Sequence, residues 1–297
     1  MNDARREPWD VRGKTVLVTG GSSGIGRATA IGLVRRGADV VLTSRDDARG
    51  EAAVRAVRAA AEGSAAVRYR TLDLASLASI ERFARHLLAE VPALHVVVHN
   101  AGIVVPQRSE TAEGFELTFG TNHLGMFRLQ QLLEPRLIES APARVVVVAS
   151  SAHHRARTGL DFEDLQARRG YDAVQVYSAS KLANVLFARQ LARRLAGSGV
   201  TANALHPGVV ATGFNADGGT GGVWGFAFKW LRPLLLSPER GARTSVHVAC
   251  EPELSAVSGA YFSSCRQKAP SRAARDDAAA LQLWKGSEEL IAAGRAH

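Results

Sequence analysis

The chain has 297 residues, 46% hydrophobic and 22% charged, and this composition excludes a disordered or fibrous protein. The formal net charge of +9 at pH 7 comes from arginines spread along the whole chain, which favours an anionic ligand but does not indicate a nucleic-acid-binding face. The two cysteines, Cys250 and Cys265, are too few for a disulfide framework and are expected to be small buried side chains in a reducing compartment.

The first residues lack the apolar core of a signal peptide before Val16. The most apolar later run, residues 221–238, is interrupted by Lys229, Arg232 and Pro233 and is too short to span a bilayer. We therefore expect a cytoplasmic protein without a transmembrane segment.

Apolar, β-rich runs alternate with helix-like segments from residue 14 to about 262. Near-continuous Val/Leu runs indicate strands buried on both faces, and their alternation with helices predicts a parallel sheet. We predict one doubly wound α/β domain of Rossmann type over residues 1–297, with about seven strands in a mainly parallel sheet and helices on both faces. The predicted strands lie within residues 14–20, 38–45, 65–74, 94–102, 143–151, 200–208 and 259–264.

Two segments, residues 153–175 and 213–236, interrupt this alternation. Both follow the carboxyl end of a strand, where open α/β sheets bind ligands, so we expect both to line the substrate site and 213–236 to form a lid. Five aromatic rings crowd the lid and favour an apolar substrate, with packing of the rings against the body as an equal alternative. These rings belong to Phe214, Trp224, Phe226, Phe228 and Trp230.

A glycine-rich turn follows the first predicted strand. Gly20, Gly24 and Gly26 of TGGSSGIG stand where the strand becomes a helix, and their spacing departs from the strict GxGxxG order. Glycines allow a tight turn and close approach to a pyrophosphate at the positive end of the helix, which predicts a dinucleotide site. The alternative is an ordinary strand-to-helix turn.

The end of the second strand indicates which dinucleotide binds. NAD sites usually have an acidic residue there, whereas this sequence has Ser44 and Arg45. An arginine suits the 2′-phosphate, so we predict that NADP(H) is preferred over NAD(H). The alternative is that Arg45 is a solvated surface charge and that Asp46 caps the next helix.

Tyr177 and Lys181 lie in the apolar-striped segment 174–196, which is predicted to be a helix. Residues four apart share one helix face, with their Cβ atoms about 5–6 Å apart. An adjacent ammonium favours the phenolate, so we expect Lys181 to lower the pKa of Tyr177 and the pair to act in acid/base catalysis. The alternative is a chance pairing of an apolar ring with a solvated ammonium.

Other polar residues accompany this pair. Ser150 and Ser151 end one predicted strand, Asn100 and Gly102 end another, and Asn122 lies within a helical stretch. A hydroxyl, an amide, a phenol and an ammonium that meet near a cofactor edge are typical of a hydride-transfer site.

These motifs together resemble the short-chain dehydrogenase/reductase family. The resemblance rests on TGGSSGIG, HNAG, Asn122, the serines at 150 and 151, YSASK and HPGVVAT, which span residues 19–212. SPERGARTSVHVA, GAYFSSC and the LW pair at 283–284 resemble its retinol-dehydrogenase-like branch. Two features depart from the pattern: His99 replaces the first asparagine of the usual motif, and the separation of Ser150 and Tyr177 is much longer than in compact members.

The resemblance implies an NADP(H)-dependent oxidoreductase that interconverts a carbonyl and an alcohol on an apolar small molecule by hydride transfer. Tyr177 would be the general acid/base, and Lys181 would lower its pKa and hold the nicotinamide ribose. Ser150 would bind the substrate oxygen, with Ser151 as the fallback. Asn122 would kink its helix and hold a water that links Lys181 to solvent.

The resemblance also implies a cofactor site. Asp73 would contact the adenine, Asn100 would support the cofactor, and Thr212 would contact the carboxamide or the phosphates. Alternatively, Asp73 caps the following helix and Thr212 serves only a turn. The implied cofactor-binding residues are Gly20, Ser22, Ser23, Gly24, Ile25, Gly26, Ser44, Arg45, Asp73, Leu74, Asn100, Ala101, Gly102, Tyr177, Lys181, Pro207, Gly208, Val210 and Thr212.

The chemistry requires no metal, and the adjacent His153 and His154 are expected to be solvated in an exposed loop. We expect no nucleic-acid partner, and family members often form homodimers or homotetramers. The competing function is a catalytically silent NADP(H)-binding or partner-binding module on the same scaffold. Its expected sign would be the loss of Ser150, Tyr177 or Lys181, and all three are present.

Overall fold

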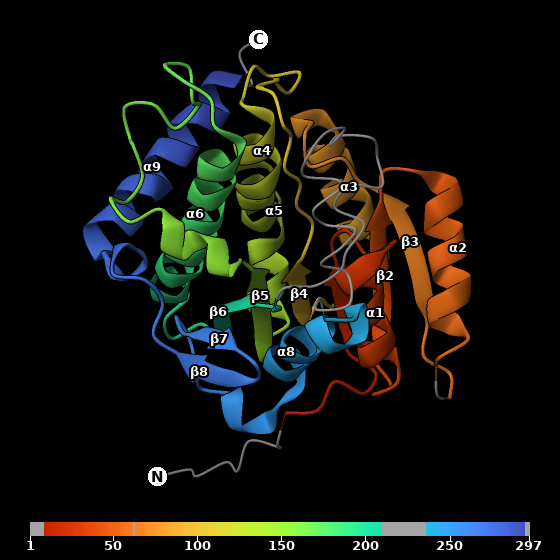
Figure 1. Ribbon diagram of the computed structural model, residues 1–297. Helices are drawn as coiled ribbons and strands as arrows, with labels where there is room; N and C mark the ends of the chain where they lie inside the picture. Colours follow the sequence, from red (N-terminus) through yellow and green to blue (C-terminus); the bar gives the residue numbers. More distant parts are fainter. Residues whose placement is uncertain (1–8, 62, 209–235, 295–297) are drawn as a thin grey trace.

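The computed structural model describes residues 9–61, 63–208 and 236–294. These residues form an eight-stranded sheet of order β3-β2-β1-β4-β5-β6-β7-β8 (Figure 1). Strands β1 to β7 all run parallel to one another, which confirms the predicted doubly wound, mainly parallel α/β domain. The strands are β1 Thr15–Val18, β2 Asp39–Ser44, β3 Val67–Thr71, β4 Val96–His99, β5 Ala143–Val148, β6 Val200–His206, β7 Tyr261–Ser263 and β8 Arg266–Lys268.

Helices cover both faces of the sheet. Side chains alternate along each strand, so that in β1 Leu17 joins one apolar core while Val16 and Val18 join the other. The core on the Val16 side includes α1 Gly24–Val34, α2 Asp47–Arg58 and α8 Pro238–Cys250. The core on the Leu17 side includes α3 Leu77–Glu90, α5 Met126–Glu139, α6 Ala173–Arg194 and α9 Asp277–Gly294.

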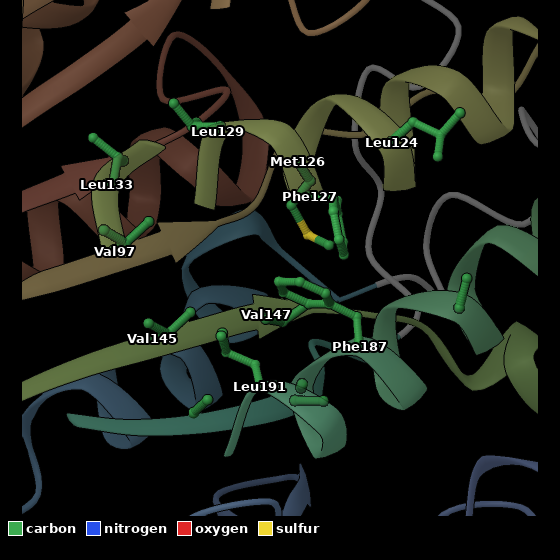
Figure 2. Packing of buried hydrophobic residues seen from close by; sticks show 14 of the residues in the cluster. Val97, Leu124, Met126, Phe127, Leu129, Leu133, Val145, Val147, Phe187 and Leu191 are labelled. Carbon is green, nitrogen blue, oxygen red and sulfur yellow. The ribbon is translucent and has the colours of Figure 1, made fainter. Parts of the chain in front are cut away.

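Aromatic rings fix α6 between the sheet and α9. Figure 2 shows Phe187 of α6 and Phe127 of α5 beside Val145 and Val147 of β5. The ring of Trp284 in α9 stacks on Phe187 with an interplanar angle of 1° and a centroid distance of 5.7 Å, and it meets Phe127 edge-on at 4.7 Å. Each such buried side chain contributes about 1.5–3 kcal/mol, so α6 has a well-fixed position along β5.

A π-helix, Gly120–Gly125, separates the short α4, Leu117–Phe119, from α5. A Cβ on Gly125 would collide with the Leu74 carbonyl oxygen, so this glycine lets the π-helix approach the loop after β3. Single π-helical turns often occur at functional sites. Short 3-10 helices also occur at Ser151–Arg155, Pro252–Leu254 and Ala273–Arg275.

The strand β8 was not among the predicted strands. It pairs antiparallel with β7 across a two-residue turn, Ser264 and Cys265, whose φ angles are +51° and +58°. Both cysteines are free, and burial raises the pKa of the Cys250 thiol to about 12. The expectation of burial is confirmed for Cys250, whereas Cys265 lies in this turn and is only partly buried.

Candidate functional site

The turn between β1 and α1 has the shape of a phosphate-binding turn. Gly20 and Gly24 have φ angles of +65° and +50°, in the left-handed region that favours glycine. A Cβ on Gly26 would collide with the carbonyl oxygen of Gly20. Ser23 begins α1 without a side-chain cap hydrogen bond, and the first turn has no acidic residue, so the positive end of the helix suits an anion. The predicted Ser22 and Ile25 lie in the same segment and are partly exposed.

The end of β4 is attached to this turn. The Asn100 side chain donates hydrogen bonds to the carbonyl oxygens of Thr19, at 3.0 Å, and Gly20, at 3.3 Å. The buried Thr19 hydroxyl accepts the backbone N–H groups of Asn100 and Ala101, at 3.0 and 3.1 Å. The sequence interpretation omitted Thr19, although it directly precedes the glycine motif. These bonds fix the two loops at the β1–β4 switch point, where open α/β sheets bind ligands.

The end of β2 presents Arg45 at the surface. Ser44 is buried, and its hydroxyl donates to the backbone oxygen of Asp46 at 2.7 Å. Asp46 is the N-cap of α2 and accepts the Arg49 N–H at 2.7 Å, as the alternative interpretation proposed. The exposed Arg45 directly follows the strand, at the position where a 2′-phosphate would be bound.

Asp73 and Leu74 follow β3. The Asp73 carboxylate accepts the Ala75 N–H at 2.9 Å, and its backbone N–H donates to the Ser79 hydroxyl at 3.0 Å. The N-cap of α3 is Ser76, so the alternative in which Asp73 caps this helix is wrong. Asp73 instead shapes the loop that leads from β3 into α3.

Asn122 lies in the π-helix and connects the loop after β4 with α6. Its side-chain oxygen accepts the Ile103 N–H at 2.7 Å, and its amide donates to the Ile103 carbonyl at 2.9 Å and to the Ser180 hydroxyl at 3.0 Å. A Cβ on Gly102 would lie 3.1 Å from the Lys181 Nζ and 3.3 Å from the Asn122 Oδ1. The kink implied at Asn122 therefore corresponds to a π-helix that contacts α6.

Ser150, Tyr177 and Lys181 meet at the carboxyl end of β5. A side-chain hydrogen bond joins Ser150 and Tyr177. The Lys181 Nζ is buried, donates to the Val148 carbonyl at 3.2 Å and lies 5.7 Å from the centre of the Tyr177 ring. Ser151 is exposed, and its N–H donates to the ring of His206, so Ser150 is the serine beside the phenol.

The pKa of Tyr177 differs from the expectation. Burial raises this pKa above 10, and the hydrogen bond with Ser150 lowers it only in part. Burial also lowers the pKa of Lys181 from 10.5 to about 8. For the protein without its cofactor this direction is opposite to the lowering expected from Lys181, because desolvation of the phenolate is the largest cause of the shift.

Pro207 and Gly208 follow β6 at the same edge of the sheet. Gly208 has a φ angle of +92°, and a Cβ there would collide with the Leu236 side chain. The predicted contacts of Val210 and Thr212 lie outside the described residues. The predicted lid, 213–236, also lies outside them except for Leu236.

Comparison with known proteins identifies the family. A family profile described as short chain dehydrogenase matches residues 14–161 and 164–220. This chain belongs to the short-chain dehydrogenase/reductase family. Retinol dehydrogenase 12 of Mus musculus is 44% identical over 281 residues, which cover 95% of this chain and 87% of that protein. The chain is therefore retinol-dehydrogenase-like within the short-chain dehydrogenase/reductase family.

Solved structures agree with this family. A protein from Mycobacterium Paratuberculosis described as uncharacterized has a TM-score of 0.75 and 36% identity, covering 96% of both chains. The Pseudomonas aeruginosa RhlG/NADP active-site complex has a TM-score of 0.67 and 26% identity, covering 86% of this chain and 97% of that one. The short-chain dehydrogenase/reductase fold binds NAD(P), and the glycine turn with its uncapped helix fits a pyrophosphate. The chain is thus an NAD(P)-dependent alcohol/carbonyl oxidoreductase.

Two histidines near the short-chain dehydrogenase/reductase motifs are buried. His99, which replaces an asparagine of the usual motif, contacts Gln130 of α5 at 3.0 Å, and burial lowers its pKa to about 4. His153 was expected to be solvated, but its side chain is 0% exposed and makes hydrogen bonds at both ring nitrogens. The expectation for His153 is wrong because other parts of the chain cover this loop, whereas His154 is exposed as expected.

The first inserted segment packs against the loop after β4. The Tyr171 hydroxyl donates to the Val105 carbonyl at 2.7 Å, and the Gln166 side-chain oxygen accepts the Glu116 N–H at 2.7 Å. These bonds place residues 166–171 of the segment 153–175 beside the residues that follow the HNAG motif of the short-chain dehydrogenase/reductase pattern. The contact of Tyr171 with Val105 brings the segment 153–175 close to Ile103, which Asn122 binds.

Two features are absent from the described part of the chain. No helix there is both apolar and long enough to cross a membrane. Histidine, cysteine and acidic side chains in residues 9–61, 63–208 and 236–294 form no cluster of three or more suited to a metal ion.

Proposed function

We propose that this protein is an NADP(H)-dependent oxidoreductase that interconverts a carbonyl and an alcohol on an apolar small molecule, with Tyr177 as general acid/base. The observation that carries the proposal is the meeting of Ser150, Tyr177 and Lys181 at the carboxyl end of β5. A bound nicotinamide would supply the hydride and, after oxidation, a positive charge. Everything else in the site is supplied by side chains of the chain.

The Ser150 hydroxyl has a second role in this proposal. Its hydrogen bond to Tyr177 places two hydroxyls side by side, and a substrate oxygen can accept from both. In the reducing direction Tyr177 donates its proton to this oxygen, and a phenol with a raised pKa holds that proton at neutral pH. In the oxidising direction the phenolate must form, and the Lys181 ammonium stabilises that charge.

The substrate class follows from the relatives and from the inserted segments. Several similar mammalian proteins are named retinol dehydrogenases, so we propose a retinoid-like or other isoprenoid, lipid-like or aromatic alcohol or aldehyde. The segments 153–175 and 213–236 would form the mouth of that site, with 213–236 as its lid. The placement of 153–175 is supported by the hydrogen bond from Tyr171 to the Val105 carbonyl. Val105 lies two residues after Ile103, which Asn122 binds.

The direct test is turnover of carbonyl compounds by the purified full chain. With NADPH, we expect reduction of all-trans-retinal and of aromatic aldehydes, measured as loss of nicotinamide absorbance, and much slower reduction of a polar sugar aldehyde. Tight NADPH binding without turnover across such a panel would favour the silent binding module instead.

A second prediction concerns the cofactor preference. Replacing Arg45 with alanine should raise the Kd for NADPH by about 10- to 100-fold, because a charge-assisted hydrogen bond to the 2′-phosphate contributes roughly 1.5–3 kcal/mol. The Kd for NADH should stay nearly constant. The control is Arg55→Ala, which removes another exposed arginine, on α2 beside Glu51, and should change neither constant. Equal losses for both cofactors in Arg45→Ala would rule out this role, and titration by nicotinamide fluorescence measures both.

A further inference from the structure

His153 holds the backbone of Ser150 from inside the protein. The backbone N–H of His153 donates to the Ser150 carbonyl at 3.2 Å, and its ring Nδ1 lies 2.6 Å from the same oxygen. The ring Nε2 accepts the N–H of Ser271 at 3.2 Å. Ser271 precedes the 3-10 helix at Ala273–Arg275, so one ring joins the end of β5 to the C-terminal part of the chain.

The partners of the ring fix its tautomer. A backbone N–H such as that of Ser271 can only donate, so Nε2 must be the unprotonated nitrogen. The proton then lies on Nδ1, which donates to the Ser150 carbonyl. Burial lowers the pKa of His153 to about 4, with smaller contributions from His154 and His206, so the ring stays neutral under ordinary conditions.

The surroundings of His153 also fix its orientation. The ring is 0% exposed and meets the Tyr261 ring of β7 edge-on, at a centroid distance of 5.0 Å. The His154 ring lies over it, at 4.0 Å between centroids. The Nδ1–H group therefore has one accessible acceptor, which is the carbonyl oxygen of Ser150.

This contact bears directly on the catalytic serine. Ser150 is the N-cap of the 3-10 helix Ser151–Arg155, and its hydroxyl accepts the Ala152 N–H at 3.2 Å while also bonding to Tyr177. Hydrogen bonds in 3-10 helices have poor geometry, so this short helix alone fixes the position of Ser150 only weakly. The ring of His153 adds a hydrogen bond of 2.6 Å at the Ser150 carbonyl oxygen, where the chain passes from Ser150 into this 3-10 helix.

We propose that His153 is a positioning residue for Ser150, acting through its Nδ1–H tautomer and anchored by Ser271. The inference rests on the proposed function, because it assigns His153 to the placement of the serine that binds the substrate oxygen. His153 itself is buried and would act through Ser150, not through contact with the substrate.

Two isosteric substitutions separate positioning from simple structural support. In His153→Asn the side-chain amide can take the place of Nδ1–H and donate to Ser150, but the acceptor for Ser271 is lost. In His153→Gln the amide oxygen can take the place of Nε2 and accept from Ser271, but the donor to Ser150 is lost. Both variants remove the ring and half of its hydrogen bonds, so a purely structural role predicts parallel losses of stability and rate.

We expect His153→Asn to keep kcat for reduction of all-trans-retinal, or of the best carbonyl in the panel, within about 3-fold of the wild type. We expect His153→Gln to lose about 10- to 100-fold in kcat, as for a small misplacement of a reacting group, with little change in the Kd for NADPH. The melting temperatures of the two variants should fall by similar amounts. Equal kcat values in the two variants, or kcat values that follow the melting temperatures, would overturn the proposal.

Matched controls and a second measurement complete the test. His154→Asn and His154→Gln make the same changes at the exposed neighbour and should not differ from each other in kcat. Nitrogen NMR of the labelled wild-type protein, with His153 assigned by substitution, should show Nδ1 protonated and Nε2 unprotonated. The opposite tautomer would refute the inference even if a variant failed to fold, and an inactive wild-type protein with the expected tautomer would instead count against the proposed function.

Discussion

Replacing Tyr177 with phenylalanine should lower kcat/KM for carbonyl reduction by about 100- to 10,000-fold, the usual contribution of a positioned general acid. The substitution removes the only atom of the side chain that exchanges a proton and leaves the ring in place. The Kd for NADPH should change by less than about 3-fold, because we propose that the glycine turn and Arg45 supply the phosphate contacts. Steady-state kinetics with NADPH and cofactor titration give both quantities.

The control for this substitution is Tyr69→Phe. Tyr69 lies in β3, with its ring against Gly50 of α2, away from the carboxyl end of β5. The same loss of a hydroxyl there should leave kcat/KM unchanged. If Tyr177→Phe retained the wild-type rate with every carbonyl that the protein reduces, the proposed acid/base role would be refuted.

Replacing Lys181 with methionine should abolish most of the activity without unfolding the protein. The ammonium is the stabilising charge for the phenolate in the oxidising direction, so alcohol oxidation should fall by at least about 100-fold. The methionine side chain has a similar length and fills the same buried space. Lys285→Met, at an exposed position on α9, is the matched control and should retain full activity.

The thermal stability of Lys181→Met should not fall together with its activity. Burial lowers the pKa of Lys181 to about 8, whereas the unfolded lysine titrates near 10.5, so the buried ammonium costs on the order of 3 kcal/mol at neutral pH. Loss of a partner for the Val148 carbonyl costs about 1–3 kcal/mol in return. We therefore expect Lys181→Met to melt at the wild-type temperature or above it at pH 7.

The difference in stability between Lys181→Met and the wild type should also depend on pH. Between pH 8 and 10.5 the unfolded state binds more protons at Lys181 than the folded state does, so the contribution of this lysine to stability rises with pH in that range. The variant lacks that contribution. The difference in free energy of unfolding, variant minus wild type, should thus decrease from pH 8 to 10.5 in denaturant titrations, and a constant difference would show that Lys181 is not desolvated.

The sequence predicted the sheet well because most of its strands are buried on both faces. Runs such as those around Val97 and Val145 have no polar side, and each of the seven predicted strands is present. The eighth strand has the opposite character, since Arg266–Lys268 is short, polar and exposed. Its turn also lacks the Asn-Gly or Asp-Gly pair that usually marks two-residue hairpins, so neither hydrophobic pattern nor turn chemistry indicated it.

The site was predictable where local spacing decides the geometry. Tyr177 and Lys181 share a helix face, and Ser150 follows a recognisable strand, so their meeting could be anticipated. The burial of His153 could not, because it depends on Ser271, which lies far away in the sequence. The raised pKa of Tyr177 in the protein without its cofactor could not be anticipated for a related reason: a spacing argument includes the neighbouring charge but not the desolvation that the whole fold imposes.

The stacking of Trp284 on Phe187 also has a consequence for biosynthesis. The start of α9 lies about 80 residues after the end of α6, so at 5–20 residues per second a ribosome needs roughly 4–16 s to produce the helix that supports α6. During that interval the nascent chain contains every proposed catalytic side chain but lacks Trp284, which packs on Phe187 of α6. The catalytic centre of this protein should therefore mature late, after the C-terminal helix has left the exit tunnel.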